Sequence, residues 1–390
     1  MRKVIVTGIS KTLFQYFVRF VTYYTSPLLF DEKVATIYIV FLYTGEKTQE
    51  RKVVSALQKV FIINPVAGKK DASHWLVPAI QQAASLAGMT PEILCTEYAG
   101  QARQLTEKLA RSGQEVHIYA CGGDGTLNEV LQAAAGQETV AVGCVPCGSG
   151  NDFVRNFGAA EDFLDMNTQL QAVPVVSDAL QTNLGVGVDI CAAGVDAQVA
   201  YGIPKFRRLP GCGGTMAYSL SIVQAMLSPF GHRLRLSIDG EEHTGTYMMM
   251  AVCNGRLYGG GYMAAPYARM DDGLLDVVLV KPMSRLRIAS VLALYREGKH
   301  LREDGTVLPS LTRWMSVCRA HRVSLDVLDS RPIVATLDGE CRPVRHLDIE
   351  NVPGRLRLLL PPTVLKSQTV LAGVDPCMAG DSVPGREKNV

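Results

Sequence analysis

Three short strings of glycine and small polar residues carry most of the chemical information in this 390-residue chain. The first, Gly122-Gly123-Asp124-Gly125-Thr126, places three glycines around one carboxylate between two apolar segments. Glycines let the backbone approach a ligand with no Cβ in the way, and a helix that begins there presents free N–H groups to phosphate. Thr126 can cap that helix or bond a phosphate oxygen, and Asp124 can bind Mg²⁺ or orient a hydroxyl. A tight structural turn explains a single string of this kind equally well.

Two further strings repeat this pattern after an apolar run. One is Asn64-Pro65-Val66-Ala67-Gly68, which is followed by Lys69-Lys70, and the other is Gly148-Ser149-Gly150-Asn151-Asp152-Phe153. The polar turn and the basic pair of the first string can hold a nucleotide. Ligands of parallel sheets bind beyond the carboxyl ends of the strands. Three such loops at one edge of a sheet are hard to explain as turns alone, and they indicate a nucleotide site.

The elements that position these loops alternate between strand and helix. Buried strands are predicted at residues 60–63, 92–96, 116–121 and 140–145, and helices at residues 75–86, 100–112, 127–135 and from Asn151 onward. Strands that alternate with helices through short loops predict a parallel sheet covered on both faces. The inward face of the first helix is expected to carry Trp75, Ile80, Ala83, Ala84 and Ala87.

In the second half of the chain, predicted strands are more frequent than predicted helices. Strands are predicted at residues 233–238, 247–253, 274–280, 322–327 and 333–337, with helical stretches at residues 216–227 and 286–297. Residues 356–360 are expected to form a last core strand before Pro361-Pro362. The pattern therefore predicts a second domain dominated by strands.

The bulk composition excludes several classes of protein. Hydrophobic residues make up 47% of the chain and charged residues 19%, which excludes wholesale disorder. A net charge of +2 is too balanced for a nucleic-acid coat, so no nucleic-acid partner is expected. The apolar runs at residues 13–30 and 34–43 are interrupted or too short to span a bilayer. We expect a cytoplasmic protein with free thiols, and an N-terminal extension of unknown role at residues 1–58.

Taken in order, Asn-Pro-x-x-Gly, Gly-Gly-Asp-Gly-Thr-x-Asn-Glu-Val and Gly-Ser-Gly-Asn-Asp-Phe resemble the diacylglycerol kinase catalytic domain. The similarity is greatest to the soluble bacterial lipid kinases, relatives of sphingosine and ceramide kinases, and it spans residues 60–362. No Gly-x-x-x-x-Gly-Lys-Ser/Thr string of a Walker loop is present.

This resemblance implies an α/β fold of two domains, like that of NAD kinases. An N-terminal α/β nucleotide-binding kinase domain would occupy residues 59–185, and a C-terminal β-sandwich would occupy residues 186–330. Residues 331–363 would return to complete the catalytic cleft. Residues 364–390, rich in glycine, proline and polar residues, are expected to be a disordered tail.

The resemblance also implies which residues contact ATP. They follow the three glycine loops and one strand end, and they are Asn64, Pro65, Gly68, Thr96, Gly122, Gly123, Asp124, Gly125, Thr126, Leu127, Asn128 and Ser149. The family often has threonine at the last of these positions, and Ser149 keeps the hydroxyl. ATP and Mg²⁺ are the implied cofactors.

A structural Mg²⁺ is implied in the second domain. The string Arg269-Met270-Asp271-Asp272-Gly273-Leu274 matches a family segment in which one carboxylate and neighbouring backbone carbonyls hold the ion. By that resemblance the ligands are Asp272 and the carbonyls of Arg269 and Leu274. Ligation by oxygen alone suits a hard cation. An Asp-Gly turn between strands is the alternative, and the residues by themselves favour it.

The string Leu337-Asp338-Gly339-Glu340 carries the implied base. By resemblance, Glu340 accepts the proton of the attacking lipid hydroxyl, and Asp338 supports the site or a second metal. Asp124 is the rival for the role of base. A plain hairpin turn is again the alternative for the bare string.

The implied reaction is the transfer of the γ-phosphoryl group of ATP to a lipid hydroxyl, with conversion of diacylglycerol to phosphatidic acid as the first choice. An NAD kinase, which shares Gly-Gly-Asp-Gly, and an inactive nucleotide-binding regulator are the alternatives. Sphingoid bases, ceramide and undecaprenol-like alcohols stay open as acceptors, because apolar pockets leave little signature in a sequence. A homodimer also stays open.

A soluble enzyme that acts on a lipid must dock on a bilayer, so peripheral membrane contact is predicted. Lys205-Phe206-Arg207-Arg208-Leu209 mixes cationic and apolar residues. The later helical stretch is basic through Arg285, Arg287, Arg296, Lys299, His300 and Arg302. Such patches attract anionic lipids. A solvated helix face is the alternative for each of them.

Overall fold

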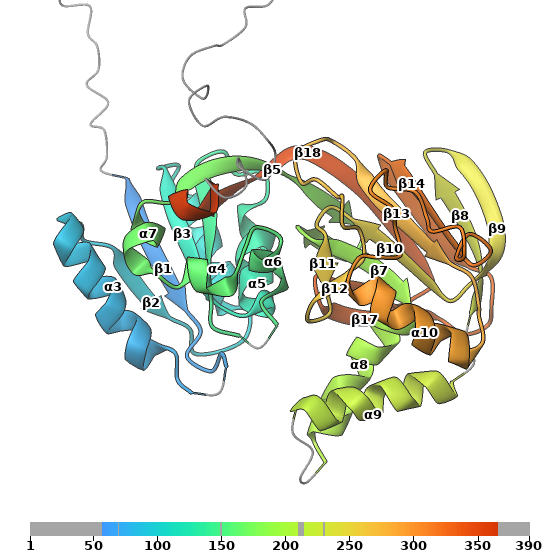
Figure 1. The fold of residues 1–390 in the computed structure, drawn as a ribbon. Coiled ribbons are helices and arrows are strands. Elements are labelled where there is room, and N and C mark those ends of the chain that lie inside the picture. The colour runs from blue at the N-terminus through green and yellow to red at the C-terminus, as the bar shows by residue number, and fades with distance from the viewer. Residues whose placement is uncertain (1–56, 69, 149, 210–213, 229–230, 366–390) are drawn as a thin grey trace, which may run out of the picture. The chain divides into compact units, whose positions relative to one another are not determined.

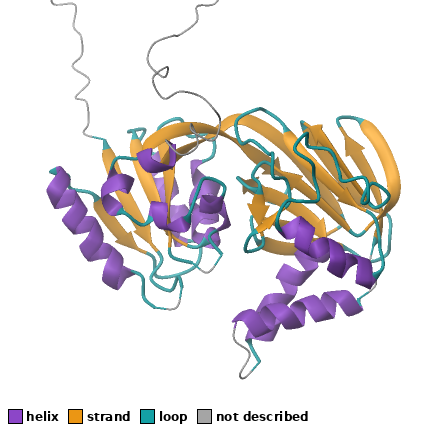
Figure 2. Cartoon of the chain, viewed as in Figure 1, coloured by secondary structure: helices purple, strands orange, loops and turns teal. Residues whose placement is uncertain are grey.

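The computed structural model describes residues 57–68, 70–148, 150–209, 214–228 and 231–365, and Figures 1 and 2 show them in one view. The predictions for residues 1–56, for Ser149 and for the tail beyond residue 365 lie outside these ranges. Within them the chain forms a ten-stranded sheet, a six-stranded sheet and a two-stranded sheet.

The first part of the larger sheet is parallel. β1 (Gln58–Ile63), β2 (Glu92–Cys95), β3 (Val116–Gly122) and β4 (Val140–Pro146) pair in the order β2-β1-β3-β4. Every residue of β3 and β4 is buried. Strands whose sheet is covered by helices on both faces are buried in this way and read as nearly continuous apolar runs. The four predicted strands are confirmed, and their carboxyl ends meet at one edge.

Helices cover both faces of these strands (Figure 2). On one face, α4 (Gln101–Ala110) and α5 (Asp124–Ala134) pack on alternate side chains of the strands, such as Ile62 and Ile118. On the other face, α3 (Ser73–Ala87) packs against Phe61 and Tyr119, whose rings stack with their centroids 4.4 Å apart. The remaining short helices of this part are α6 (Asp152–Arg155), η1 (Ala160–Phe163) and α7 (Met166–Leu170).

Two details of the predicted helices are wrong. Trp75 is 45% exposed and Ala87 is exposed, whereas Leu76 lies in the core. Leu76 stands four residues before Ile80, so the two share the buried face of the helix. Trp75 is the neighbouring residue, and the helical twist between adjacent positions turns its side chain toward solvent. The helix expected from Asn151 onward is a single turn, α6, followed by η1.

One long strand joins the parallel strands to the antiparallel part of the same sheet. β18 (His346–Leu360) pairs in parallel with β4 and antiparallel with β5 (Val173–Thr182) and β15 (Arg322–Val327). Only the last five residues of β18 were predicted, because Pro353 and Gly354 interrupt the run where its pairing with β5 shifts register. β6 (Gly185–Gly187) pairs with β5, and β8 (His232–Ile238) and β9 (Glu241–Tyr247) complete the sheet.

The six-stranded sheet packs on this antiparallel part. It has the order β14 (Met315–Ala320), β13 (Leu275–Val280), β10 (Met249–Cys253), β7 (Ile190–Gly194), β16 (Ile333–Leu337) and β17 (Glu340–Val344). Its inward side chains, such as Val252 and Val277, share one core with Leu236 and Val323 of the larger sheet. Two sheets with a common core form the predicted β-sandwich.

Three longer helices accompany the sandwich. α8 (Val195–Arg207) was not predicted, because Gly202 and Pro204 lie inside it, while α9 (Gly214–Leu227) and α10 (Arg285–Arg296) match the predicted stretches. β11 (Leu257–Tyr258) and β12 (Tyr262–Met263) form the two-stranded sheet. Among the described helices, none has the length and apolar content that crossing a membrane requires.

Candidate active site

A cleft of about 1200 Å³ opens at the carboxyl ends of the parallel strands. The loops after β1, β2, β3 and β4 line one side of it, and the turn between β16 and β17 lines another. The sequence-predicted residues at its wall are Asn64, Pro65, Gly68, Thr96, Gly123, Asp124, Gly125, Thr126, Asn128, Asp338 and Glu340. Gly122 and Leu127 lie behind this wall, because Gly122 ends the buried strand β3 and Leu127 is 3% exposed.

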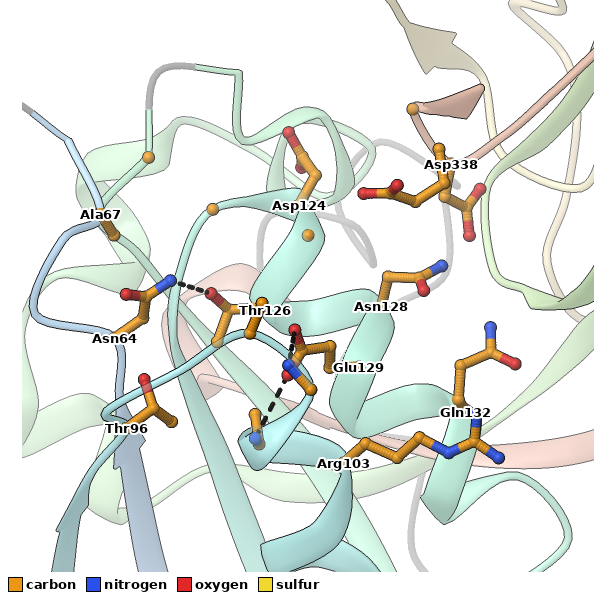
Figure 3. A pocket seen from close by; sticks show the side chains of 18 of the residues that line it. Asn64, Ala67, Thr96, Arg103, Asp124, Thr126, Asn128, Glu129, Gln132 and Asp338 are labelled. Atoms are coloured by element: carbon orange, nitrogen blue, oxygen red, sulfur yellow. Dashed lines mark hydrogen bonds between the residues drawn. The ribbon is translucent and has the colours of Figure 1, made fainter. Parts of the chain in front are cut away.

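Direct hydrogen bonds hold the glycine loops to one another. The side-chain amide of Asn64 donates to Thr126 Oγ1 at 3.0 Å, as Figure 3 shows. The backbone N–H of Asn64 donates to the carbonyl of Cys121 at 2.9 Å, and that of Cys147 donates to the carbonyl of Gly122 at 2.8 Å. The loops after β1, β3 and β4 therefore form one connected surface.

The contact between two of these loops requires glycine. A Cβ at Gly148 would lie 2.5 Å from the Cα of Gly123, and a Cβ at Gly123 would lie 3.2 Å from the Cα of Gly148. The obstruction is backbone, so a side chain at either position must separate the loops. The glycines of the two strings thus bring the backbone N–H groups at the start of α5 next to the loop after β4.

Asp124 binds the loop that follows β4. Its two carboxylate oxygens accept hydrogen bonds from the backbone N–H groups of Asn151, at 2.9 Å, and Asp152, at 2.8 Å. Asn151 has a φ of 54°, and its side chain exchanges two further hydrogen bonds with the backbone of Gly148. Asp124 therefore shapes the cleft as well as lining it.

Asp338 anchors the turn between β16 and β17. Its carboxylate accepts hydrogen bonds from the backbone N–H groups of Val188 at 2.7 Å, Asp189 at 3.0 Å and Ile190 at 2.9 Å. Burial raises the pKa of Asp338 to about 6, although these hydrogen bonds act in the opposite direction. With three donors in place, this side chain positions Glu340 two residues further on.

Glu340 differs from both aspartates because its side chain is exposed in the cleft. Its Oε1 would lie 3.6 Å from a Cβ built on Gly125, so the carboxylate faces the glycine loop at the start of α5. None of the described residues donates a hydrogen bond to its carboxylate, which leaves both oxygens available to a ligand. A free carboxylate opposite a glycine loop at the start of a helix has a position from which it can act as a general base.

Two features of the cleft went unrecognised in the sequence. Glu129 accepts hydrogen bonds from the backbone N–H groups of Gly100, at 2.8 Å, and Ala102, at 3.2 Å, and so caps the start of α4. It stands inside the Asn-Glu-Val string, which was the available signal. Arg103 and Arg342 supply positive charge at the cleft wall, and no motif marked either of them.

Acidic side chains gather behind the cleft. Asp189 is buried, accepts a hydrogen bond from the side chain of Asn156 at 2.8 Å, and has a pKa well above its ordinary value through burial and then the charge of Asp338. Burial also raises the pKa of Asp152, with the charge of Asp124 acting in the same direction. A cation that arrives with a nucleotide would offset this repulsion, but among the described residues no three acidic, histidine or cysteine side chains are grouped so as to hold a metal ion by themselves.

The loop predicted to hold a structural Mg²⁺ is differently arranged. The carboxylate of Asp272 contacts the guanidinium of Arg319 and accepts a hydrogen bond from the backbone N–H of Leu274 at 3.1 Å. The carbonyl of Leu274 accepts from the side chain of Asn351 at 3.0 Å, and the side chain of Arg269 pairs with Asp271. Since Arg319 already balances Asp272, these residues as they lie do not fit a further divalent cation.

Comparison with known proteins agrees with this geometry. Residues 58–181 match the model of the diacylglycerol kinase catalytic domain, and residues 189–360 match the YegS C-terminal NAD kinase β-sandwich-like domain. A Xanthomonas axonopodis pv. citri protein named probable lipid kinase YegS-like is 30% identical over 291 residues, which cover 70% of this chain and 88% of that protein. The chain belongs to the YegS/diacylglycerol kinase family of lipid kinases. The diacylglycerol kinase of Bacillus subtilis is 25% identical over 303 residues, which cover 77% of this chain and 95% of that one.

The fold of this lipid kinase family member also has solved counterparts. A diacylglycerol kinase from Bacillus anthracis strain Sterne superimposes with a TM-score of 0.56 at 19% identity, over 79% of this chain and 98% of that one. A second structure from the same strain has a TM-score of 0.60 at 21% identity. The prediction of an α/β nucleotide-binding domain followed by a β-sandwich is confirmed.

Proposed function

We propose that this chain transfers the γ-phosphoryl group of ATP to the hydroxyl of a lipid, with diacylglycerol as the acceptor. The observation that carries the proposal is the carboxylate of Glu340, which faces Gly125 across the cleft and accepts no hydrogen bond from any residue that the structure describes. The named diacylglycerol kinase of Bacillus subtilis supports the choice of acceptor.

The nucleotide would lie over the connected glycine loops. Thr126 and the free N–H groups at the start of α5 would meet its phosphates, and Asn64 holds the Thr126 hydroxyl in place. Arg103 and Arg342 add positive charge along the same wall. When Mg²⁺ accompanies the nucleotide, Asp124 is the carboxylate placed to hold it, and the ion would offset the charge of the phosphates.

The acceptor hydroxyl would lie between Glu340 and the phosphates. Glu340 accepts the proton as the hydroxyl oxygen attacks the γ-phosphorus, and ADP leaves with the electron pair of the broken bond. Asp338 keeps Glu340 in place through three backbone N–H groups. Asp124 is less suited to the role of base, since both of its oxygens already accept backbone hydrogen bonds.

Radiolabelled ATP incubated with diacylglycerol in detergent micelles tests this proposal, with NAD in a parallel reaction. We expect labelled phosphatidic acid from the unaltered chain and none above background from Glu340→Ala. Label in NADP would overturn the lipid assignment. ATP binding without label in any product would show a nucleotide-binding protein that has lost catalysis.

A further inference from the structure

The helix α9 exposes large apolar side chains. It carries no charged residue in 14 positions. Met216 and Val223 are each 54% exposed and Leu227 is 76% exposed, at spacings of seven and four residues that place them along one side of the helix. Helices of water-soluble proteins normally place charged and polar residues on that side.

The opposite side of α9 is lined by small residues. Ala217, Ser221 and Ala225 are buried, and the hydroxyl of Ser221 donates to the carbonyl of Val199 in α8 at 2.5 Å. A Cβ at Gly202 of α8 would collide with that hydroxyl. The two helices therefore approach closely through small residues, as helices do in an apolar medium, while the large side chains point away.

Positive charge flanks both ends of α9. Lys205, Arg207 and Arg208 lie at the end of α8, and none of them has a carboxylate partner among the described residues. Beside the other end of α9, Arg285 of α10 donates to the carbonyl of Met226 at 2.7 Å, and the next residue, Leu286, is 87% exposed.

The sequence around these helices is strongly biased in charge. Residues 197–238 contain no aspartate or glutamate, and neither do residues 277–296. Figure 1 shows α9 next to α8, which itself lies against β7 and β16 of the six-stranded sheet. The surface formed by α9, the end of α8 and the start of α10, here called the α9 surface, thus combines apolar side chains with positive charge.

We propose that the α9 surface docks on a lipid bilayer that carries anionic lipids. This inference rests on the proposed lipid kinase function, because the substrate then lies in that bilayer. A helix of 14 residues is about 21 Å long, and it would lie flat at the interface with its large apolar side chains among the acyl chains. The flanking cations would meet the lipid phosphates.

A second copy of the chain is a poorer occupant of the same surface. Across a two-fold axis the same patch meets itself, so Lys205, Arg207 and Arg208 of one copy would face like charges of the other. An anionic bilayer complements the apolar residues and the cations at once.

Sedimentation with vesicles tests the proposal on the full chain. We expect binding to vesicles of phosphatidylcholine with added phosphatidylglycerol, weaker binding to phosphatidylcholine alone, and loss of binding in high salt. Val223→Glu with Leu227→Glu should weaken binding by at least about tenfold. Each substitution removes an apolar side chain that the bilayer would bury and puts a negative charge in its place. Arg207→Gln with Arg208→Gln should weaken it about fivefold for each charge removed.

Two controls separate docking from other effects. Leu86→Glu changes an equally exposed leucine, 77% exposed on α3, and should bind vesicles like the unaltered chain. Phosphoryl transfer to diacylglycerol in detergent micelles should persist in the docking variants, which shows that they fold, and vesicle binding should persist in Glu340→Gln, which lacks only the base. The milder Leu227→Ser serves if the double variant does not fold.

Two results would overturn the proposal. One is vesicle binding by the α9 variants that equals that of Leu86→Glu. The other is a dimer of the unaltered chain in solution that the α9 variants convert to a monomer, which would assign the surface to a second copy. Failure of the kinase reaction with normal vesicle binding would count against the proposed function alone.

Discussion

Two of the Asp-Gly turns in the chain, at residues 337–340 and 271–274, have surroundings that give them opposite properties. In the turn at residues 337–340, Asp338 points into protein and accepts three backbone hydrogen bonds, and Glu340 stays free in the cleft. In the turn at residues 271–274, Asp272 contacts Arg319, and the turn lies outside the cleft wall.

The difference shows what a short acidic string encodes. Both strings encode a turn, because Asp-Gly accommodates the positive φ seen at Gly273 and Gly339. Their roles are decided by partners far along the chain. The amides that hold Asp338 lie about 150 residues earlier, and Arg319 lies 47 residues after Asp272.

Removal of the free carboxylate should have the largest effect. Glu340→Gln keeps the shape of the side chain but cannot accept the proton, so kcat should fall by roughly 10² to 10⁴ with ATP binding unchanged. Steady-state phosphoryl transfer to diacylglycerol measures this. Glu350→Gln, at an exposed glutamate of β18, is the matched control. A fall in kcat of less than tenfold would contradict Glu340 as the base and would favour Asp124 in that role.

Removal of the anchor should affect both stability and turnover. Asp338→Ala leaves three backbone N–H groups without their acceptor, which should lower the free energy of unfolding by about 3 kcal/mol. Turnover should fall as well, because Glu340 loses its fixed position. Denaturant titration and kinetics measure the two effects. Asp304→Ala, at an exposed aspartate bonded only to Thr306, should change neither, and an equal loss there would remove the special role of Asp338.

The pH dependence of stability should report on the same anchor. Because the pKa of Asp338 rises from 3.8 to about 6 on folding, its protonation favours the folded state. That contribution is complete below pH 3.8 and is lost as the pH rises through about 6. Denaturant titrations across this window should show stability falling with pH, and the slope should be smaller in Asp338→Asn. Equal slopes in the two proteins would contradict the assignment.

The smallest effect is expected at the second turn. Arg319 is half exposed, so Arg319→Met should cost less than about 1 kcal/mol of stability. The variant leaves Asp271, Asp272 and Asp276 with less positive charge nearby, and added Mg²⁺ should then raise its melting temperature. The unaltered chain should not respond to Mg²⁺ or EDTA. A response of the unaltered chain would support the predicted Mg²⁺ ligands Arg269, Asp272 and Leu274.

The local parts of the active site could be predicted from the sequence. The apolar runs of β1, β3 and β4 and the glycines after them specify strand, loop and helix start within a few residues, since each depends on neighbouring residues alone. The buried face of α3 was predicted with an error of one residue, because Trp75 is apolar and directly precedes the buried Leu76.

The anchors of the site could not be predicted in the same way. Nothing in residues 337–340 shows that Asp338 accepts from Val188 while Glu340 faces Gly125, and nothing near Asp272 points to Arg319. The exposure of α9 was also hidden, because an uncharged helix reads as a core helix until its small residues are seen against α8.

The sequence by itself determined the alternation of strands and helices around the parallel strands, the positions of the glycine loops and the family to which the chain belongs. These depend on residue types at short spacing, where backbone conformation and local hydrophobic period decide the outcome. Only the tertiary structure decided which carboxylate is free, which is anchored and which is neutralised. Those states depend on hydrogen bonds and charges from residues that the fold brings together across long stretches of chain.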